Sequence, residues 1–128
     1  MNELELKNEL NSYYRVKQLI NALERSEKEH QEFIENCKTL SIDIPEDKTN
    51  VYKSKLNEVY QEAIDAKNKV LQYIELLKDY PESRAVLYAR YINNENPVEM
   101  EETLMCSRRT VARKKKKAIE LLLFKINS

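Results

Sequence analysis

The chain has 128 residues, contains no Gly or Trp, and balances 22 Lys and Arg against 22 Asp and Glu. An average chain has about 7% Gly, and without it few positions adopt positive φ at low cost. This composition argues against a hairpin-rich β fold, and the length fits one domain or two small ones. We therefore expect an all-α protein.

Several classes of site are disfavoured. Cys37 and Cys106 lie far apart without CxxC spacing, which indicates reduced thiols in a cytosol rather than a disulfide or a metal site. No apolar run approaches the roughly 18 residues of a membrane span, and the N-terminus does not resemble a signal peptide. A phosphate-binding P-loop requires Gly, and no nucleophile with a base or carboxylate pair stands out. We expect a cytoplasmic protein that is not an enzyme and has no cofactor, metal or membrane partner.

Charge is unevenly distributed along the chain. Residues 1–80 hold 12 basic and 16 acidic side chains, whereas residues 81–128 hold 10 and 6. A polyanionic partner is therefore expected to meet the C-terminal part.

Two sets of mainly apolar residues in the N-terminal part are spaced alternately by three and four positions, and each set forms a stripe. Such spacing places side chains along one side of a helix. The first stripe consists of Tyr13, Val16, Ile20, Leu23, Glu27, His30, Ile34 and Cys37. The second, which is typical of a coiled coil, consists of Tyr52, Leu56, Val59, Ala63, Ala66, Val70, Tyr73, Leu77 and Tyr80.

The segment SIDIPEDKTN between the stripes predicts a break, because Pro45 cannot continue a helix and Asp47 and Thr49 supply turn and cap chemistry. We expect residues 1–80 to form an antiparallel helical hairpin that serves interaction or dimerisation. Whether the stripes pair within one chain or between two chains is left open. His30 is expected to have a core or interface role, with Glu27 as a candidate partner.

Residues 81–128 predict a second module. Pro81 disfavours helical backbone at Tyr80 and marks the junction. The next segment, ESRAVLYARYI, predicts a support helix. Its expected buried face consists of Val86, Leu87, Tyr91 and Ile92.

The support helix is followed by the pattern of two helices that meet at a tight turn. Asn96 is the expected N-cap of the first, with Glu99 as its capping-box partner. Met105 and Cys106 form the corner, and Ser107 caps the second helix. The residues expected to face a core are Val98, Met100 and Leu104. This pattern predicts a helix-turn-helix.

The final helix is strongly basic, with seven cationic side chains and no acid over residues 103–119. If Val111 points to the core, a rotation of about 100° per residue defines the opposite face. That face carries Arg109, Arg113, Lys116 and Glu120. We expect Arg109 and Arg113 to contact base edges in the major groove, because Arg can bond guanine O6 and N7 together.

Phosphate contacts are predicted beside that face. Arg108, Lys114 and Lys117 flank it, and Ser107 with the free amides of the first turn can also bind phosphate. Lys115 points partly toward the core, so its stem is expected to pack while the amine reaches water. The predicted DNA-binding set is Ser107, Arg108, Arg109, Thr110, Arg113, Lys114, Lys116 and Lys117.

The segment from Ser83 to Leu122 resembles region 4 of sigma-70-type factors. The positions that carry the resemblance are Arg90, Tyr91, Glu99, Met100, Leu104, Ser107, Thr110, Val111, Ala118 and Leu122. Glu101 stands where that pattern usually has Ala, and Met105 where it usually has Gly. An acidic coiled-coil front end before such a module is similar to small phage-encoded late-gene regulators of Gram-positive bacteria, of the ArpU and RinA type.

The resemblance implies a sequence-specific activator of phage or mobile-element genes that binds duplex DNA beside host RNA polymerase, at the bacterial nucleoid. A regulatory or inhibitory protein and a homodimer through the hairpin are further expected partners. Two alternatives stay open. One is a recognition subunit for DNA packaging, similar to a small terminase, and the other is a protein-interaction module that uses the same scaffold without DNA.

Overall fold

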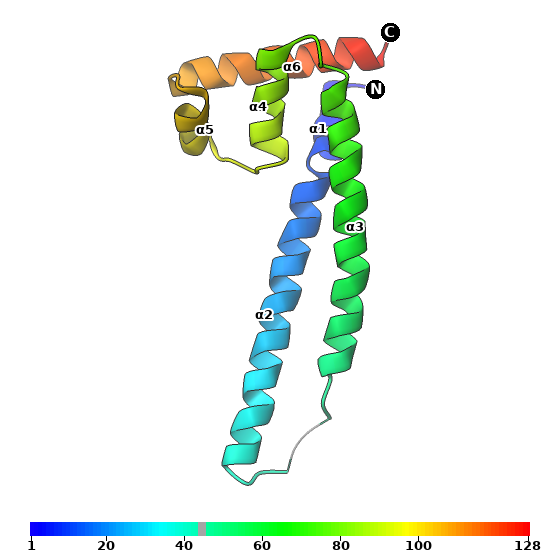
Figure 1. The fold of residues 1–128 in the computed structure, drawn as a ribbon, viewed down its shortest axis with the longest axis vertical. Coiled ribbons are helices and arrows are strands. Elements are labelled where there is room, and N and C mark those ends of the chain that lie inside the picture. Colours follow the sequence, from blue (N-terminus) through cyan, green and yellow to red (C-terminus); the bar gives the residue numbers. More distant parts are fainter. Residues whose placement is uncertain (44–45) are drawn as a thin grey trace. The chain divides into compact units, whose positions relative to one another are not determined.

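The computed structural model describes residues 1–43 and 46–128, and within them all regular structure is helical, which confirms the all-α prediction. The helices in chain order are α1 (Glu3–Leu10), α2 (Ser12–Thr39), α3 (Thr49–Glu75), α4 (Pro81–Tyr91), α5 (Pro97–Leu104) and α6 (Arg108–Ile126) (Figure 1). No helix among the described residues has the length and apolar character to cross a membrane.

The described residues form two compact units. The first comprises residues 1–14 and 65–128, and the second comprises residues 15–64. The predicted division after Tyr80 differs from this one, because the end of α3 shares a core with α4 and α6. Tyr80 itself, the last position of the predicted second stripe, is 42% exposed.

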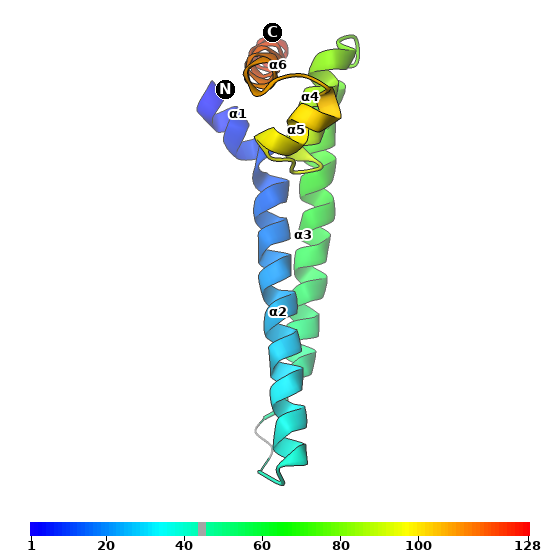
Figure 2. The ribbon, with the colours of Figure 1, turned by 90° about the vertical axis from the view of Figure 1, so that its left-hand side faces the viewer.

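The larger core of the first unit joins the four helices α1, α3, α4 and α6. Figure 2 looks nearly along α6, with α1 and α4 on either side of it. The buried side chains of this core are Leu6, Leu10, Val70, Ile74, Leu77, Leu87, Tyr91, Ile92, Ala118, Ile119 and Leu122. Removal of their apolar surface from water, worth about 25 cal/mol per Å², holds α6 against its three neighbours.

The separate helix α1 was not predicted from the sequence. Asn2 caps it, since its side chain accepts a hydrogen bond from the Glu5 amide at 2.9 Å. Leu6 and Leu10, one turn apart, both reach 0% exposure in the larger core. Asn127 joins the chain ends, because its Nδ2 donates to the Met1 carbonyl at 3.0 Å.

A smaller cluster lies where α4, α5 and α6 meet. Val86, Ala89, Met100 and Val111 are buried in it, and Leu104 and Cys106 pack against them. The expectation that Val98 faces a core was wrong, since this side chain is 54% exposed. Met100 points inward, and a residue two positions earlier on a helix lies about 200° around the axis from it.

In the second unit, α2 and the first part of α3 lie side by side (Figures 1 and 2). The buried side chains between them are Ile34, Cys37, Leu56 and Val59. The Tyr60 hydroxyl donates to a Glu24 carboxylate oxygen at 2.6 Å, which joins the two helices at their edge. All four buried residues belong to the predicted stripes, so the period correctly identified the inward side.

The start of α3 is attached to α2 through His30. His30 Nε2 accepts a hydrogen bond from the Lys48 amide at 2.9 Å and lies 3.6 Å from Asp47 Oδ1. Its ring stands 5.6 Å from that of Tyr52, centroid to centroid. Glu27, the candidate partner of His30, instead accepts a hydrogen bond from Gln31 Nε2 one turn later on the same helix.

The segment between α2 and α3 begins after Thr39 and ends at Thr49. Asp47 supplies the predicted cap chemistry, since its Oδ1 accepts from the Thr49 amide at 2.9 Å. The hydrogen bonds from Thr49 hold the pKa of the Asp47 carboxyl below its usual value. Pro45, which was expected to cause the break, lies outside the described residues.

Candidate nucleic-acid interface

Capping and turn residues determine where α5 begins and ends, and therefore where the basic helix α6 can start. The Asn96 side chain accepts from the Glu99 amide at 2.9 Å, and the Glu99 carboxylate accepts from the Asn96 amide at 3.2 Å, which confirms the predicted capping box before α5. Met105 then takes the left-handed conformation, with φ 53° and ψ 46°. Such a position costs a residue with a Cβ about 1 kcal/mol. The chain thereby turns sharply between α5 and α6.

Ser107 is the N-cap of α6, as predicted. Its Oγ accepts from the Thr110 amide at 3.3 Å and donates to Thr110 Oγ1 at 3.0 Å. These two residues of the predicted DNA-binding set therefore already satisfy each other. Ser107 remains exposed, whereas Thr110 is half-buried.

The inward side of α6 matches the helical-wheel prediction. Val111 is 3% exposed and packs in the smaller cluster. Ala118, Ile119 and Leu122 lie in the larger core. Because both ends of the helix are anchored by apolar contacts, the orientation of its polar side is determined.

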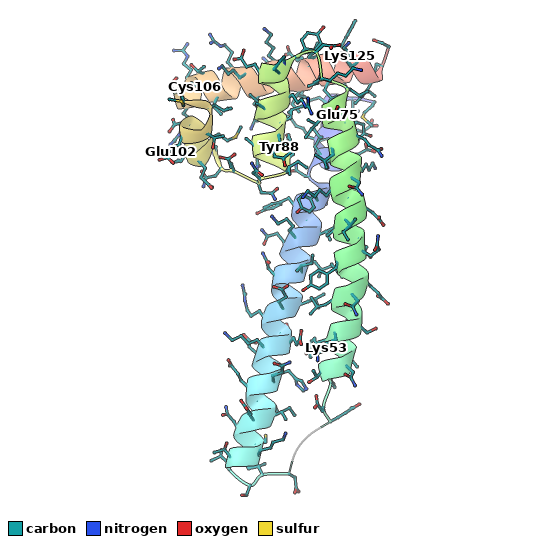
Figure 3. The ribbon with its side chains drawn as sticks, viewed as in Figure 1. Lys53, Glu75, Tyr88, Glu102, Cys106 and Lys125 are labelled. Carbon is teal, nitrogen blue, oxygen red and sulfur yellow. The ribbon has the colours of Figure 1, made fainter. Side chains whose placement is uncertain are left out.

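The polar side of α6 carries cations that are not ion-paired in the described part of the chain. Arg109, Arg113, Lys116 and Lys117 are all exposed. None of the four forms an ion pair within 4 Å in the described part of the chain. Figure 3 shows side chains that project from α6 on the side away from α4 and α5, between Cys106 at one end and Lys125 at the other.

Two other members of the predicted set are paired within the protein. Arg108 Nε lies 3.5 Å from a Glu101 carboxylate oxygen. Lys114 Nζ lies 2.6 Å from Glu82 Oε1 at the start of α4. This hydrogen bond raises the pKa of the Lys114 amine and lowers the pKa of the Glu82 carboxyl. Both lysine and carboxylate therefore stay ionised across the physiological range.

Lys115 is half-buried, as its position on the helical wheel predicts. It lines a pocket of about 220 Å³ with Glu3 and Lys7 of α1. Burial, followed by the nearby charges of Arg90 and Lys7, lowers the pKa of its amine. Lys115 thus belongs to the contact between α1 and α6 rather than to the outward side.

Sequence reasoning missed the acidic partners of the basic helix. Glu82 and Glu101 lie on α4 and α5, so only the tertiary structure brings them to Lys114 and Arg108. One signal was present for Lys114, because a residue three positions after Val111 lies about 60° from the core direction. That register predicts a side chain at the edge of α4 rather than one that points outward.

The structure provides no cluster for metal binding in residues 1–43 and 46–128, where no three His, Cys, Asp or Glu side chains come together. Cys37 and Cys106 are free thiols.

Comparison with known proteins identifies a family for this chain. A family model described as "Protein of unknown function (DUF1492)" matches residues 48–123, which include all of α3, α4 and α5 and most of α6. No curated protein matches the chain, and no solved structure matches it. Since the family model covers more than half of the sequence, the chain belongs to the DUF1492 family.

Proposed function

We propose that α5 and α6 form a helix-turn-helix that binds duplex DNA, with α6 as the recognition helix. The support for this comes from the capped start of α5, the left-handed corner at Met105 and the Ser107 cap, which together place an eight-residue helix and a 19-residue helix on either side of a tight turn. The first residues of such a recognition helix reach base edges in the major groove. Arg109 and Arg113 lie in that part of α6.

The observation that carries the proposal is the group of four exposed cations, Arg109, Arg113, Lys116 and Lys117, none of which forms an ion pair within 4 Å in residues 1–43 and 46–128. Arg108 and Lys114, in the same helix, differ from these four because each pairs with an acid on a neighbouring helix. A row of phosphates along a duplex would supply the missing counter-charges.

The biological role that fits these features is regulation of transcription. The resemblance of residues 83–122 to region 4 of sigma-70-type factors supports an activator of phage or mobile-element genes that works beside host RNA polymerase. The pair of α2 and α3 in residues 15–64 would provide a hairpin for interaction or dimerisation.

A mobility shift assay on random duplex, followed by selection of bound sequences from a random pool, tests this function. We expect binding of any duplex at low salt and enrichment of one site, either single or repeated as two half-sites. No shift at low ionic strength would overturn DNA binding and favour a protein-interaction module. A ring of about eight or more chains, by mass in solution, would favour a packaging subunit over a transcription regulator.

A further inference from the structure

A notch of about 340 Å³ lies between the start of α4 and the middle of α6. At about 30 Å³ per water, it has room for a phosphate group and several solvent molecules. Its lining residues are Glu82, Ser83, Val86, Arg113, Lys114 and Lys117.

The notch contains more positive than negative charge. Arg113, Lys114 and Lys117 converge on it from α6, whereas Glu82 is the single acid in its lining. The hydrogen bond from Lys114 lowers the pKa of the Glu82 carboxyl most, and the charges of Lys117 and Arg113 lower it further. All three cations therefore act on the place that the Glu82 carboxylate occupies, and two positive charges remain unbalanced.

The α4 side of the notch offers hydrogen-bond donors. The N-cap residue Tyr80 provides no side-chain hydrogen bond, and Pro81 occupies the first turn. The amides of Glu82 and Ser83 thus begin the helix without an acceptor from the side chain of the cap, and both residues line the notch. Donors of this kind, with positive charge around them, suit a tetrahedral oxyanion.

We propose that this notch binds a backbone phosphate of duplex DNA, and that Glu82 occupies the same place in the free protein. The proposal rests on DNA binding by α6 and adds a competing carboxylate to it. The phosphate would take over Lys114 while Glu82 turns into water. Since the Glu82 side chain is already 68% exposed, this movement needs no repacking of the core.

Glu82→Gln tests the competition, with Glu102→Gln as the matched control. Both variants remove one negative charge from the same unit. Glu102 is exposed on the outer side of α5 (Figure 3) and lines none of this notch. We expect Glu82→Gln to raise affinity for random and preferred duplex alike by about two- to fivefold, the factor that corresponds to loss of one exposed ion pair. Glu102→Gln should change affinity less than about twofold.

Equal gains from the two variants would overturn the proposal, because the effect would then come from net charge alone. A loss of affinity in Glu82→Gln would overturn it as well, since Glu82 would then position Lys114 instead of competing for it.

A titration with inorganic phosphate separates this inference from DNA binding. Nuclear magnetic resonance signals of the Ser83 amide and the Arg113 side chain should shift with phosphate, at lower concentration in Glu82→Gln, and should not shift with chloride at equal ionic strength. These shifts without any duplex binding would leave the notch as an anion site and overturn the proposed function. Duplex binding without these shifts, and with equal effects of the two Gln variants, would overturn the proposed phosphate site in the notch. The proposed DNA binding by α6 would then still stand.

Discussion

Lys114 and Lys115 are neighbours in the sequence, yet their amines have opposite environments. The hydrogen bond to Glu82 raises the pKa of Lys114, whereas burial lowers the pKa of Lys115. The cause is the step of about 100° per residue around a helix, which directs one side chain to α4 and the next toward α1. A run of four lysines therefore has at least three roles, and only part of it is available for an external polyanion.

Arg109 and Arg113 differ in the same way, and a pair of substitutions should separate them. Arg113 lines the notch beside α4, whereas Arg109 lies one turn earlier and outside it. Arg109→Ala should cost about 1 to 3 kcal/mol on a selected site and much less on random duplex. Arg113→Ala should weaken both duplexes, because it also removes a charge from the proposed phosphate site.

Thermal stability and affinity are measured together for these variants, with Val111→Asp as the folding control. Val111 is buried, so the Asp variant should lose stability and all binding, whereas the Arg variants should melt like the wild type. If Arg109→Ala weakened both duplexes equally, Arg109 would be a phosphate contact.

Tyr73 provides a pH-dependent contribution to stability. Its hydroxyl donates to a Glu9 carboxylate oxygen, which with partial burial raises the pKa of Tyr73 to about 12. Because the phenol is harder to ionise in the folded protein, its contribution is complete below the unfolded pKa of about 10. It is then lost as the pH rises toward 12.

Ultraviolet titration of phenolate formation measures this effect. Tyr73→Phe should remove the phenolate step near pH 12 and flatten the fall in melting temperature between the two pKa values. Tyr88→Phe, at a 42% exposed position, is the matched control and should leave that step in place. A step of equal size in both variants would show that Tyr73 titrates like an exposed phenol.

At the scale of single helices, the spacing of the buried residues and the identity of the capping residues were predictable from the sequence. The stripes identified Ile34, Cys37, Leu56 and Val59 as inward residues because each helix faces one partner there. The caps at Asn96 and Ser107 were also predictable, since a cap depends on residues within one turn.

Elements that pack on several partners were less predictable. Ile74 lies outside the four-three alternation but is 2% exposed, because the end of α3 meets more than one neighbour in the larger core. The helix α1 has only eight residues, too few to show a period. In the candidate site, the helical wheel correctly identified the exposed cations of α6. The pairing of Lys114 with Glu82 and of Arg108 with Glu101 was not predictable, because it depends on tertiary contacts.

The two halves of α3 should respond differently to a buried charge. Leu56 belongs to residues 15–64, whereas Val70 lies in the core that holds α6. A carboxylate at either position loses water without gaining a partner, which should cost at least about 3 kcal/mol. Leu56→Asp should therefore speed amide hydrogen exchange near Ile34, and Val70→Asp should speed it at Ile119 and Leu122.

Ser54→Asp is the control for this experiment, because it adds the same charge at an exposed position of α3. Its exchange rates should stay close to those of the wild type. Equal acceleration of all amides by Leu56→Asp would contradict the division into two units and indicate a single cooperative core.

For the whole molecule, the two units imply that residues 81–128 are not an independent binding module. Leu6, Leu10, Val70 and Leu77 cover the same core side chains that anchor α4 and α6. A chain shortened to its basic part would expose this surface and remove the support of α6, the proposed recognition helix. The neutral total charge is also uninformative about partners, because the excess of cations is concentrated on one side of α6.

The salt dependence of duplex binding should report how many of these cations are available. Each neutralised phosphate contributes a slope of about −0.9 in a plot of log affinity against log salt. If about four basic side chains of one chain neutralise phosphates, the slope should be about −3.6, and a dimer should give about twice that. Lys117→Ala should reduce the slope by about 1 for every sequence, whereas Lys125→Ala, at the far end of α6, should leave it unchanged. A slope near zero, or the same reduction from both lysine variants, would mean that the basic side of α6 does not lie along the phosphates.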